Sequence, residues 1–258
     1  MSSGKIAEID GLPVHYLEAG SGKTIVFLHG AGGAPPRGAM FVPMLAERHR
    51  VLVPSRPGFD GTPIGSCETV QDAVAVMAGF IRAVVRGKAH IVAQSLGGAI
   101  GCWLAVLHPD LVESLVLSAP AAFAGRRALP RPEEMAQILY GDAPSWTAAP
   151  DAAEQKRIAG NAQANMDRLR AAEGNADLLA RLGEIKVPTL LLWATGERLL
   201  PAEAMLPYQE RIPRCHRILI HGAAHELPIA AAPRWVRLVA DFVDRGEMFV
   251  VNTGTAAG

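Results

Sequence analysis

The stretch His90-Ile-Val-Ala-Gln-Ser-Leu-Gly-Gly-Ala99 decides the fold of this chain. It opens with a short apolar run, rich in β-branched residues, that predicts a buried strand. Ser95 follows, with the small residues Ala93 two positions before it and Gly97 two positions after it. The apolar run from 99 to 107 then predicts a helix. A strand, a sharp turn with serine at its apex and a helix are typical of a nucleophile elbow, although such a serine can also be a helix N-cap.

Apolar runs of strand length alternate with segments of helical periodicity over most of the chain. This alternation predicts an α/β fold with a doubly wound, mostly parallel sheet. The sequence Asp10-Gly11 is a hairpin signal between the first two strands. We expect strands near 5–10, 14–18, 24–28, 50–54, 90–94, 115–117, 187–193 and 217–220, and helices near 38–49, 70–85, 99–107 and 229–245 and from 201.

The alternation breaks between residues 121 and 185, where Ala, Arg, Glu and Pro are frequent. The pattern there predicts helices at about 132–140, 151–173 and 176–182 but no strand. We therefore expect residues 1–120 and 186–250 to form one core, with residues 121–185 as a helical insertion after the sixth core strand. Residues 251–258 are small and polar, and we expect them to form a flexible tail.

The 25 basic and 25 acidic side chains among 258 residues cancel. This balance gives no reason to expect a nucleic acid or an anionic membrane as a partner. No run approaches the roughly 20 apolar residues of a membrane-spanning helix, and the N-terminus lacks a hydrophobic signal core. Three widely spaced cysteines fit neither a disulfide framework nor a metal site. We expect a cytoplasmic enzyme, a monomer or homodimer, that acts on a small-molecule substrate.

Unusual polar residues follow the predicted strands at their carboxyl ends, where such sheets bind ligands. A serine nucleophile needs a base, and the base needs a third group to hold its tautomer. His225 lies after the last predicted strand, and Glu197 is the only carboxylate in the loop after the preceding one. We predict that Ser95 is the nucleophile, His225 the general base and Glu197 the orienting acid. The plainer alternatives are a surface histidine and a solvated loop glutamate.

Five motifs together resemble those of the α/β-hydrolase superfamily, in its single-chain branch with a helical cap, which includes serine esterases and C–C hydrolases. The order of nucleophile, acid and histidine also matches that family. The resemblance extends over nearly the whole chain. Its motifs are His29-Gly-Ala-Gly-Gly33, Arg56-Pro-Gly-Phe59, Ala93-Gln-Ser-Leu-Gly-Gly98, the loop 193–201 and Gly222-Ala-Ala-His225.

The resemblance implies that the backbone N–H groups of Ala31 and Leu96 form the oxyanion hole, while His29 braces the loop that carries Ala31. It implies no metal and no organic cofactor. A serine nucleophile argues against the dehalogenase and epoxide hydrolase branches, whose nucleophile is aspartate. Three positions depart from the usual family pattern: Ala93 replaces a glycine, Glu197 an aspartate and Ser55 an acidic residue.

Specificity is expected to reside in the helical cap, residues 121–185, and in the walls beneath it. Packing of the apolar cap residues on the core is an equally good interpretation of the pattern. Arg126, Arg127 and Arg131 could hold an acid group of the substrate or be solvated charges. The pocket candidates are Gly30, Gly32, Phe123, Met135, Leu139, Tyr140 and Trp146.

The expected activity is hydrolysis of a small carboxylic ester, thioester or lactone through an acyl-enzyme on Ser95. The same triad also serves C–C bond hydrolysis, perhydrolysis and hydroxynitrile-lyase-type chemistry in the superfamily, so these outcomes stay open. A relative that binds a ligand without catalysis is a further alternative.

Overall fold

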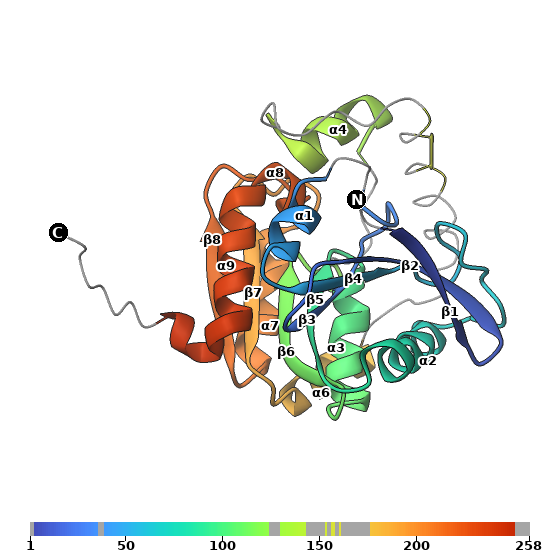
Figure 1. Cartoon of the computed structure of the whole chain (residues 1–258). Helices are drawn as coiled ribbons and strands as arrows, with labels where there is room; N and C mark the ends of the chain where they lie inside the picture. The colour runs from blue at the N-terminus through green and yellow to red at the C-terminus, as the bar shows by residue number, and fades with distance from the viewer. Residues whose placement is uncertain are drawn as a thin grey trace.

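A computed structural model describes residues 3–35, 39–123, 130–142, 153, 156, 157, 160 and 176–250 of the chain. An eight-stranded sheet in the order β1-β2-β4-β3-β5-β6-β7-β8 forms its centre (Figure 1). The pairs β1–β2 and β2–β4 are antiparallel and all other pairs are parallel, which confirms the expected mostly parallel sheet. The strands are β1 Ser3–Ile9, β2 Leu12–Ala19, β3 Thr24–Leu28, β4 Arg50–Pro54, β5 Ala89–Gln94, β6 Val112–Ser118, β7 Thr189–Ala194 and β8 Cys215–Ile220.

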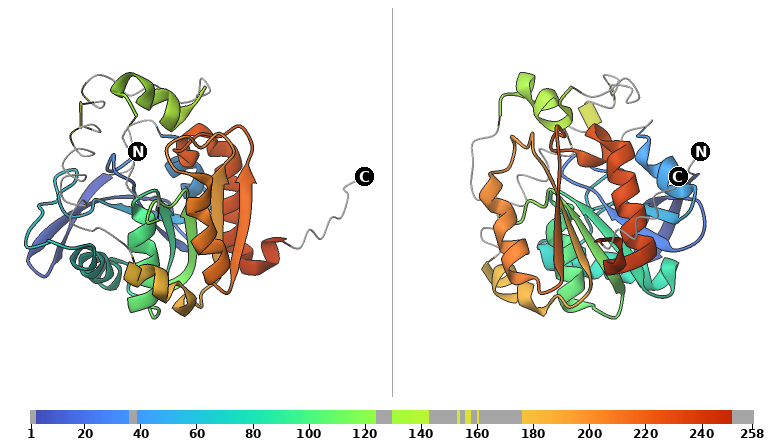
Figure 2. Two further views of the ribbon diagram at one scale, coloured as in Figure 1. Left: turned by 180° about the vertical axis from the view of Figure 1, so that it is seen from behind. Right: turned by 90° about the vertical axis from the view of Figure 1, so that its left-hand side faces the viewer.

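Helices cover both faces of the sheet because alternate strand residues point to opposite faces. In β3, Val26 and Leu28 pack in the core cluster that contains α2, α3, α6 and α7, whereas Ile25 and Phe27 pack with α1 and α9. Figure 2 shows this arrangement of helix, sheet and helix from two further sides. The helices are α1 Phe41–Ala46, α2 Val70–Phe80, α3 Gly97–Leu107, α6 Ala176–Arg181, α7 Leu206–Arg211 and α9 Ala232–Arg245.

Proline explains where two helices differ from the sequence prediction. The helix expected over 38–49 is Phe41–Ala46, and it cannot begin much earlier because Pro43 lacks an N–H and is tolerated in a first turn only. The helix expected over 229–245 is divided at Ala231, whose backbone is not helical, into α8 (Leu227–Ala230) and α9. Pro233 then lies in the first turn of α9, where its missing N–H has no consequence.

The segment between β6 and β7 contains helices where the sequence predicts them. Helix α4 spans Pro132–Tyr140, and α6 begins at Ala176, close to the expected bounds. The helix expected over 151–173 lies almost entirely outside the described residues. Figure 1 shows α4 above one end of the sheet, and two backbone hydrogen bonds join it to the loop between β8 and α8. In the described parts of the chain, no helix is long and apolar enough to cross a membrane.

Candidate active site

Ser95 stands at the turn between β5 and α3, where the chain reverses sharply. Its φ is 51°, a left-handed conformation that a residue with a side chain adopts only when its surroundings impose it. Those surroundings are backbone hydrogen bonds: Ser95 N donates to Ser118 O at 2.9 Å, and Ser95 O accepts from Gly98 N at 2.9 Å and from Ala121 N at 3.0 Å. The turn is held from β6 and from α3, and it presents the serine hydroxyl at the carboxyl end of β5.

Gly97 packs directly against the end of β3. A Cβ at this position would lie 2.2 Å from Leu28 O and 2.8 Å from His29 O, both of them backbone atoms that cannot rotate away. The glycine therefore lets α3 begin against the strand that precedes the loop from His29 to Gly33. This contact gives a physical reason for a small residue two positions after Ser95.

We expect Gly97→Ala to lower the free energy of unfolding by about 1–3 kcal/mol, because the added methyl forces the backbones of β3 and α3 apart. Urea denaturation measures this change. Gly87→Ala is the matched control, since a Cβ at the exposed Gly87 meets nothing within 4 Å. Equal stability of the two variants would show that the elbow does not depend on this contact.

The structure brings Ser95, His225 and Glu197 into one chain of hydrogen bonds. His225 Nε2 lies 3.0 Å from Ser95 Oγ, and His225 Nδ1 lies 2.7 Å from Glu197 Oε2. Because a carboxylate can only accept, Nδ1 donates to Glu197 and Nε2 is left to accept the proton of the Ser95 hydroxyl. This tautomer is the one that a general base for serine requires.

The loop after β7 holds the longer side chain of Glu197 in place. One carboxylate oxygen, Oε1, accepts from Leu199 N at 2.7 Å and from Leu200 N at 3.0 Å, while Oε2 faces His225. Burial raises the pKa of Glu197, but the hydrogen bond with His225 and the two backbone N–H groups outweigh it, so the net pKa is lowered. Glu197 is therefore ionised at neutral pH.

The surroundings of His225 favour its protonated form. Burial lowers the pKa of this ring, but the hydrogen bond to Glu197 and the negative charges of Glu197 and Glu226 outweigh burial. The net pKa is raised above the ordinary 6.5 of histidine. An imidazole with a raised pKa is a stronger base and holds a transferred proton more firmly.

The loop after β3 is braced by His29 and Arg56. His29 Nδ1 donates to Gly30 O at 2.9 Å, Arg56 Nη2 donates to the same oxygen at 2.8 Å, and Arg56 N donates to His29 Nε2 at 3.1 Å. Burial and the charge of Arg56 hold the pKa of His29 well below its usual value, so His29 is neutral. The guanidinium of Arg56 lies 4.6 Å from the ring centre of Phe59. These contacts fix Gly30 next to Ser95.

The backbone N–H groups of Ala31 and Leu96 have no acceptor among the described residues. Both belong to residues beside Ser95: Leu96 follows it, and Ala31 follows Gly30, where a Cβ would lie only 3.1 Å from Ser95 Cβ. Free N–H groups that flank a nucleophile are the feature from which oxyanion holes are built.

Two residues of the site were not selected from the sequence. Gln94 Nε2 donates to His225 O at 2.9 Å and so ties the loop of the histidine to the residue before Ser95. The carboxyl group of Glu226 reaches the space beside Gly30. Gln94 directly precedes Ser95 and Glu226 directly follows His225. Both could therefore have been selected from the sequence as neighbours of predicted triad residues.

Four of the pocket candidates lie on α4 and in the turn that follows β6. Met135, Leu139 and Tyr140 are half-buried on α4. Leu139 O accepts from Glu226 N at 2.8 Å, which places the end of this helix next to the histidine loop. Phe123 packs its ring 4.9 Å from that of Tyr208. Trp146, Arg126 and Arg127 lie outside the described residues.

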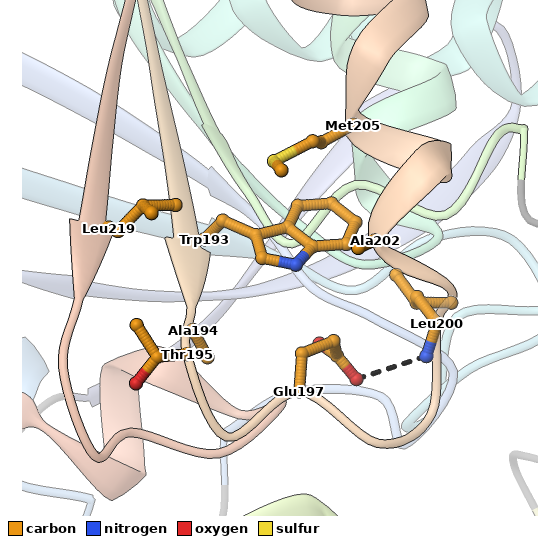
Figure 3. A pocket seen from close by; sticks show the side chains of 8 residues that line it. All are labelled: Trp193, Ala194, Thr195, Glu197, Leu200, Ala202, Met205 and Leu219. Atoms are coloured by element: carbon orange, nitrogen blue, oxygen red, sulfur yellow. Dashed lines mark hydrogen bonds between the residues drawn. The ribbon is translucent and has the colours of Figure 1, made fainter.

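A pocket of about 180 Å³ borders Glu197 (Figure 3). Neither Ser95 nor His225 lines it, so this pocket is separate from the space beside the serine. Most of the side chains along its wall are apolar. The lining residues are Trp193, Ala194, Thr195, Glu197, Leu200, Ala202, Met205 and Leu219.

A family model described as "Alpha/beta hydrolase family" matches residues 25–238 of the chain. The chain belongs to the alpha/beta hydrolase family. The match includes β3, the elbow, the loop of Glu197 and His225, and it confirms the resemblance seen in the sequence. Together with the sheet order, this membership identifies the chain as a hydrolase of the alpha/beta type.

The relatives include enzymes that cleave two kinds of bond. The chain is 27% identical to the 2-hydroxy-6-oxo-6-phenylhexa-2,4-dienoate hydrolase of Burkholderia cepacia, with 90% of this chain and 92% of that protein covered. It is 28% identical to the pimeloyl-[acyl-carrier protein] methyl ester esterase of Aeromonas hydrophila subsp. hydrophila, with 87% and 96% covered. Among solved structures, a serine hydrolase involved in carbazole degradation, the CarC enzyme, has a TM-score of 0.79 at 24% identity and covers 95% of this chain and 99% of its own.

Proposed function

We propose that this alpha/beta hydrolase cleaves a small carboxylic ester, thioester or lactone through an acyl-enzyme on Ser95. The observation that carries the proposal is the continuous hydrogen-bond chain from Ser95 Oγ through His225 to the buried carboxylate of Glu197. A neutral serine hydroxyl is a weak nucleophile, and this chain supplies the base and the group that orients it. The esterase among the relatives also supports an ester substrate.

The proposed reaction follows from these positions. His225 Nε2 takes the proton of Ser95 as its Oγ attacks the acyl carbonyl, and Glu197 stabilises the imidazolium that forms. The N–H groups of Ala31 and Leu96 donate to the oxyanion of the tetrahedral intermediate. His225 then protonates the leaving alcohol or thiol. In the second half of the reaction, His225 takes a proton from water as the water attacks the acyl-enzyme, and it returns that proton to Ser95 Oγ as the acid is released.

We also propose that residues 121–185 form a cap over this site. In support, His225 N donates to Ile138 O at 3.4 Å and Glu226 N donates to Leu139 O at 2.8 Å, so the end of α4 rests on the loop that carries the base. The half-buried Met135, Leu139 and Tyr140 of α4 are then the side chains that would select the substrate.

The test of the proposed function is hydrolysis of p-nitrophenyl acetate and butyrate, together with labelling by a fluorophosphonate probe. We expect turnover of both esters, and a label that peptide mapping locates on Ser95. Absence of both turnover and labelling would reject the proposal and favour a relative that binds a ligand without catalysis.

Hydrolysis of a C–C bond is the second candidate, because two relatives that match about nine-tenths of the chain are named as dienoate hydrolases and a third as a dienedioate/trienedioate hydrolase. In that reaction water would cleave the bond next to a ketone and release a carboxylic acid and an enol that becomes a ketone. Cleavage of 2-hydroxy-6-oxo-6-phenylhexa-2,4-dienoate, compared with the p-nitrophenyl esters by kcat/KM, decides between the two candidates.

The raised pKa of His225 predicts how activity depends on pH. Only neutral His225 can accept the proton of Ser95, so kcat/KM falls as pH decreases through the pKa of this ring in the free enzyme. We expect the acid limb for p-nitrophenyl butyrate to have its midpoint above pH 6.5. A pH–rate profile from about pH 5 to 9 measures it. Glu197→Gln should move the midpoint to lower pH, and an unchanged midpoint would contradict the assigned cause of the shift.

A further inference from the structure

Glu226 places a polar group beside Ser95 that the proposed reaction does not use. The position that a Cβ on Gly30 would occupy lies 3.1 Å from Ser95 Cβ and 3.7 Å from Glu226 Oε1. The carboxyl group and the serine side chain therefore border the same small space. A substrate whose carbonyl is attacked by Ser95 has to bring its neighbouring atoms into that space.

The backbone of Glu226 is held by several hydrogen bonds, while its side chain has no partner among the residues that the structure describes. Its N–H donates to Leu139 O at 2.8 Å, and its carbonyl accepts from Ile229 N at 2.9 Å and Ala230 N at 2.7 Å. Within the described residues, neither carboxyl oxygen has a hydrogen bond or an ion pair. A largely enclosed carboxyl without a donor is unfavourable unless another molecule supplies the donor.

The charge of Glu226 points to the kind of donor. Burial raises the pKa of this carboxyl, the charge of His225 lowers it and that of Glu197 raises it, and the net direction is upward. An ionised and unpaired carboxylate close to Ser95 would oppose the negative charge that develops on the carbonyl oxygen during attack. An ammonium group of the substrate that pairs with Glu226 offsets this negative charge, and a hydroxyl group supplies the missing hydrogen-bond donor.

We propose that Glu226 selects substrates that carry a hydrogen-bond donor, a hydroxyl or an ammonium, on the carbon bonded to the scissile carbonyl. The inference rests on the proposed function, because it needs an acyl substrate on Ser95. After the carbonyl itself, a substituent on this carbon is the part of the acyl group that lies closest to the serine. It stays in the site during both acylation and deacylation. An ammonium forms the stronger, charge-assisted hydrogen bond with a carboxylate.

Three methyl esters of nearly equal shape test the inference: methyl isobutyrate, methyl lactate and methyl alaninate. Their α-substituents are a methyl, a hydroxyl and an amino group, and at about pH 7 the amino group is still mostly protonated. We expect kcat/KM of the native protein to be roughly tenfold or more higher for the alaninate and the lactate than for the isobutyrate.

Two variants separate charge from hydrogen bonding. Glu226→Leu should abolish the preference for methyl alaninate and for methyl lactate over methyl isobutyrate. Glu226→Gln keeps the shape and an acceptor oxygen, so it should abolish the preference for the alaninate but keep part of the preference for the lactate. The exposed Glu210 on α7 provides the control, since Glu210→Gln should leave all three ratios unchanged. Thermal unfolding of each variant shows whether it is folded.

Equal ratios for the native protein and both Glu226 variants would overturn the inference, while hydrolysis of p-nitrophenyl butyrate would still uphold the proposed function. A loss of the same size for all three esters in folded Glu226→Gln would also overturn it, because selection of a substituent requires a difference between esters. If the native protein hydrolyses none of these esters and no p-nitrophenyl ester, and the fluorophosphonate probe does not label it, both the proposed function and this inference are rejected.

Discussion

Replacing Ser95 with alanine is expected to lower kcat/KM for p-nitrophenyl butyrate by at least ~10³-fold, the scale for loss of a triad nucleophile. In the proposed reaction, the substitution removes the atom that attacks the carbonyl, while the N–H groups of Ala31 and Leu96 stay in place. Most of the loss should be in kcat, because the oxygen is used in bond formation rather than in substrate binding. Steady-state kinetics on both proteins measures the effect.

The control for this experiment is Ser66→Ala, which removes an exposed serine hydroxyl far along the chain from the elbow. It should keep full activity and full labelling by the fluorophosphonate probe, and Ser95→Ala should not be labelled at all. If Ser95→Ala keeps within about tenfold of native activity, the acyl-enzyme on Ser95 is rejected.

Changing Glu197 to glutamine is expected to lower kcat for the same ester by on the order of 10³-fold or more. The amide can present an N–H to His225 Nδ1, and the ring would then place its own proton on Nε2, where it can no longer accept from Ser95. If the amide instead presents its oxygen, the negative charge that stabilises the imidazolium is still lost. Either way, KM should change much less than kcat.

Glu197→Asp is the informative partner of this variant. In the native protein one oxygen of Glu197 binds Leu199 N and Leu200 N while the other binds His225. An aspartate is one methylene shorter and cannot keep both sets of bonds, so we expect an intermediate loss of activity with the charge retained. Glu203→Gln, at an exposed position, should be indistinguishable from the native protein. A Glu197→Gln variant with native kcat would show that the carboxylate has no role in the reaction.

The sheet and the chain of hydrogen bonds could be predicted because the residues that build them are local and distinctive. The run 24–28 is apolar throughout, which indicates a strand with helices on both faces, and it forms β3 within the predicted bounds. Ser95, His225 and Glu197 each follow a strand of a parallel sheet, and such loops converge at one edge. The structure brings these three side chains together as their positions in the sequence suggested.

Other details of the site and of the helix ends could not be predicted, because they depend on contacts between segments that are far apart in the sequence. The position of the Glu226 carboxyl beside Gly30 and Ser95 is evident only in three dimensions. The same holds for the hydrogen bond from Gln94 to the carbonyl of His225. The bend at Ala231 reflects the position of Pro233 in a first turn, a feature that periodicity alone does not resolve. Such details are set by distances between particular residues in the folded chain, and composition does not predict them.

The junction between α4 and the histidine loop consists of main-chain groups, with Ile138 O and Leu139 O as acceptors and the N–H groups of His225 and Glu226 as donors. Hydrogen bonds of this kind do not depend on which side chains the helix carries. The face of α4 that bears Met135, Leu139 and Tyr140 can therefore be varied in a substitution library while the loop of His225 keeps its support. If the proposed cap is correct, α4 is the natural place to engineer a new substrate range, with the proposed triad left untouched.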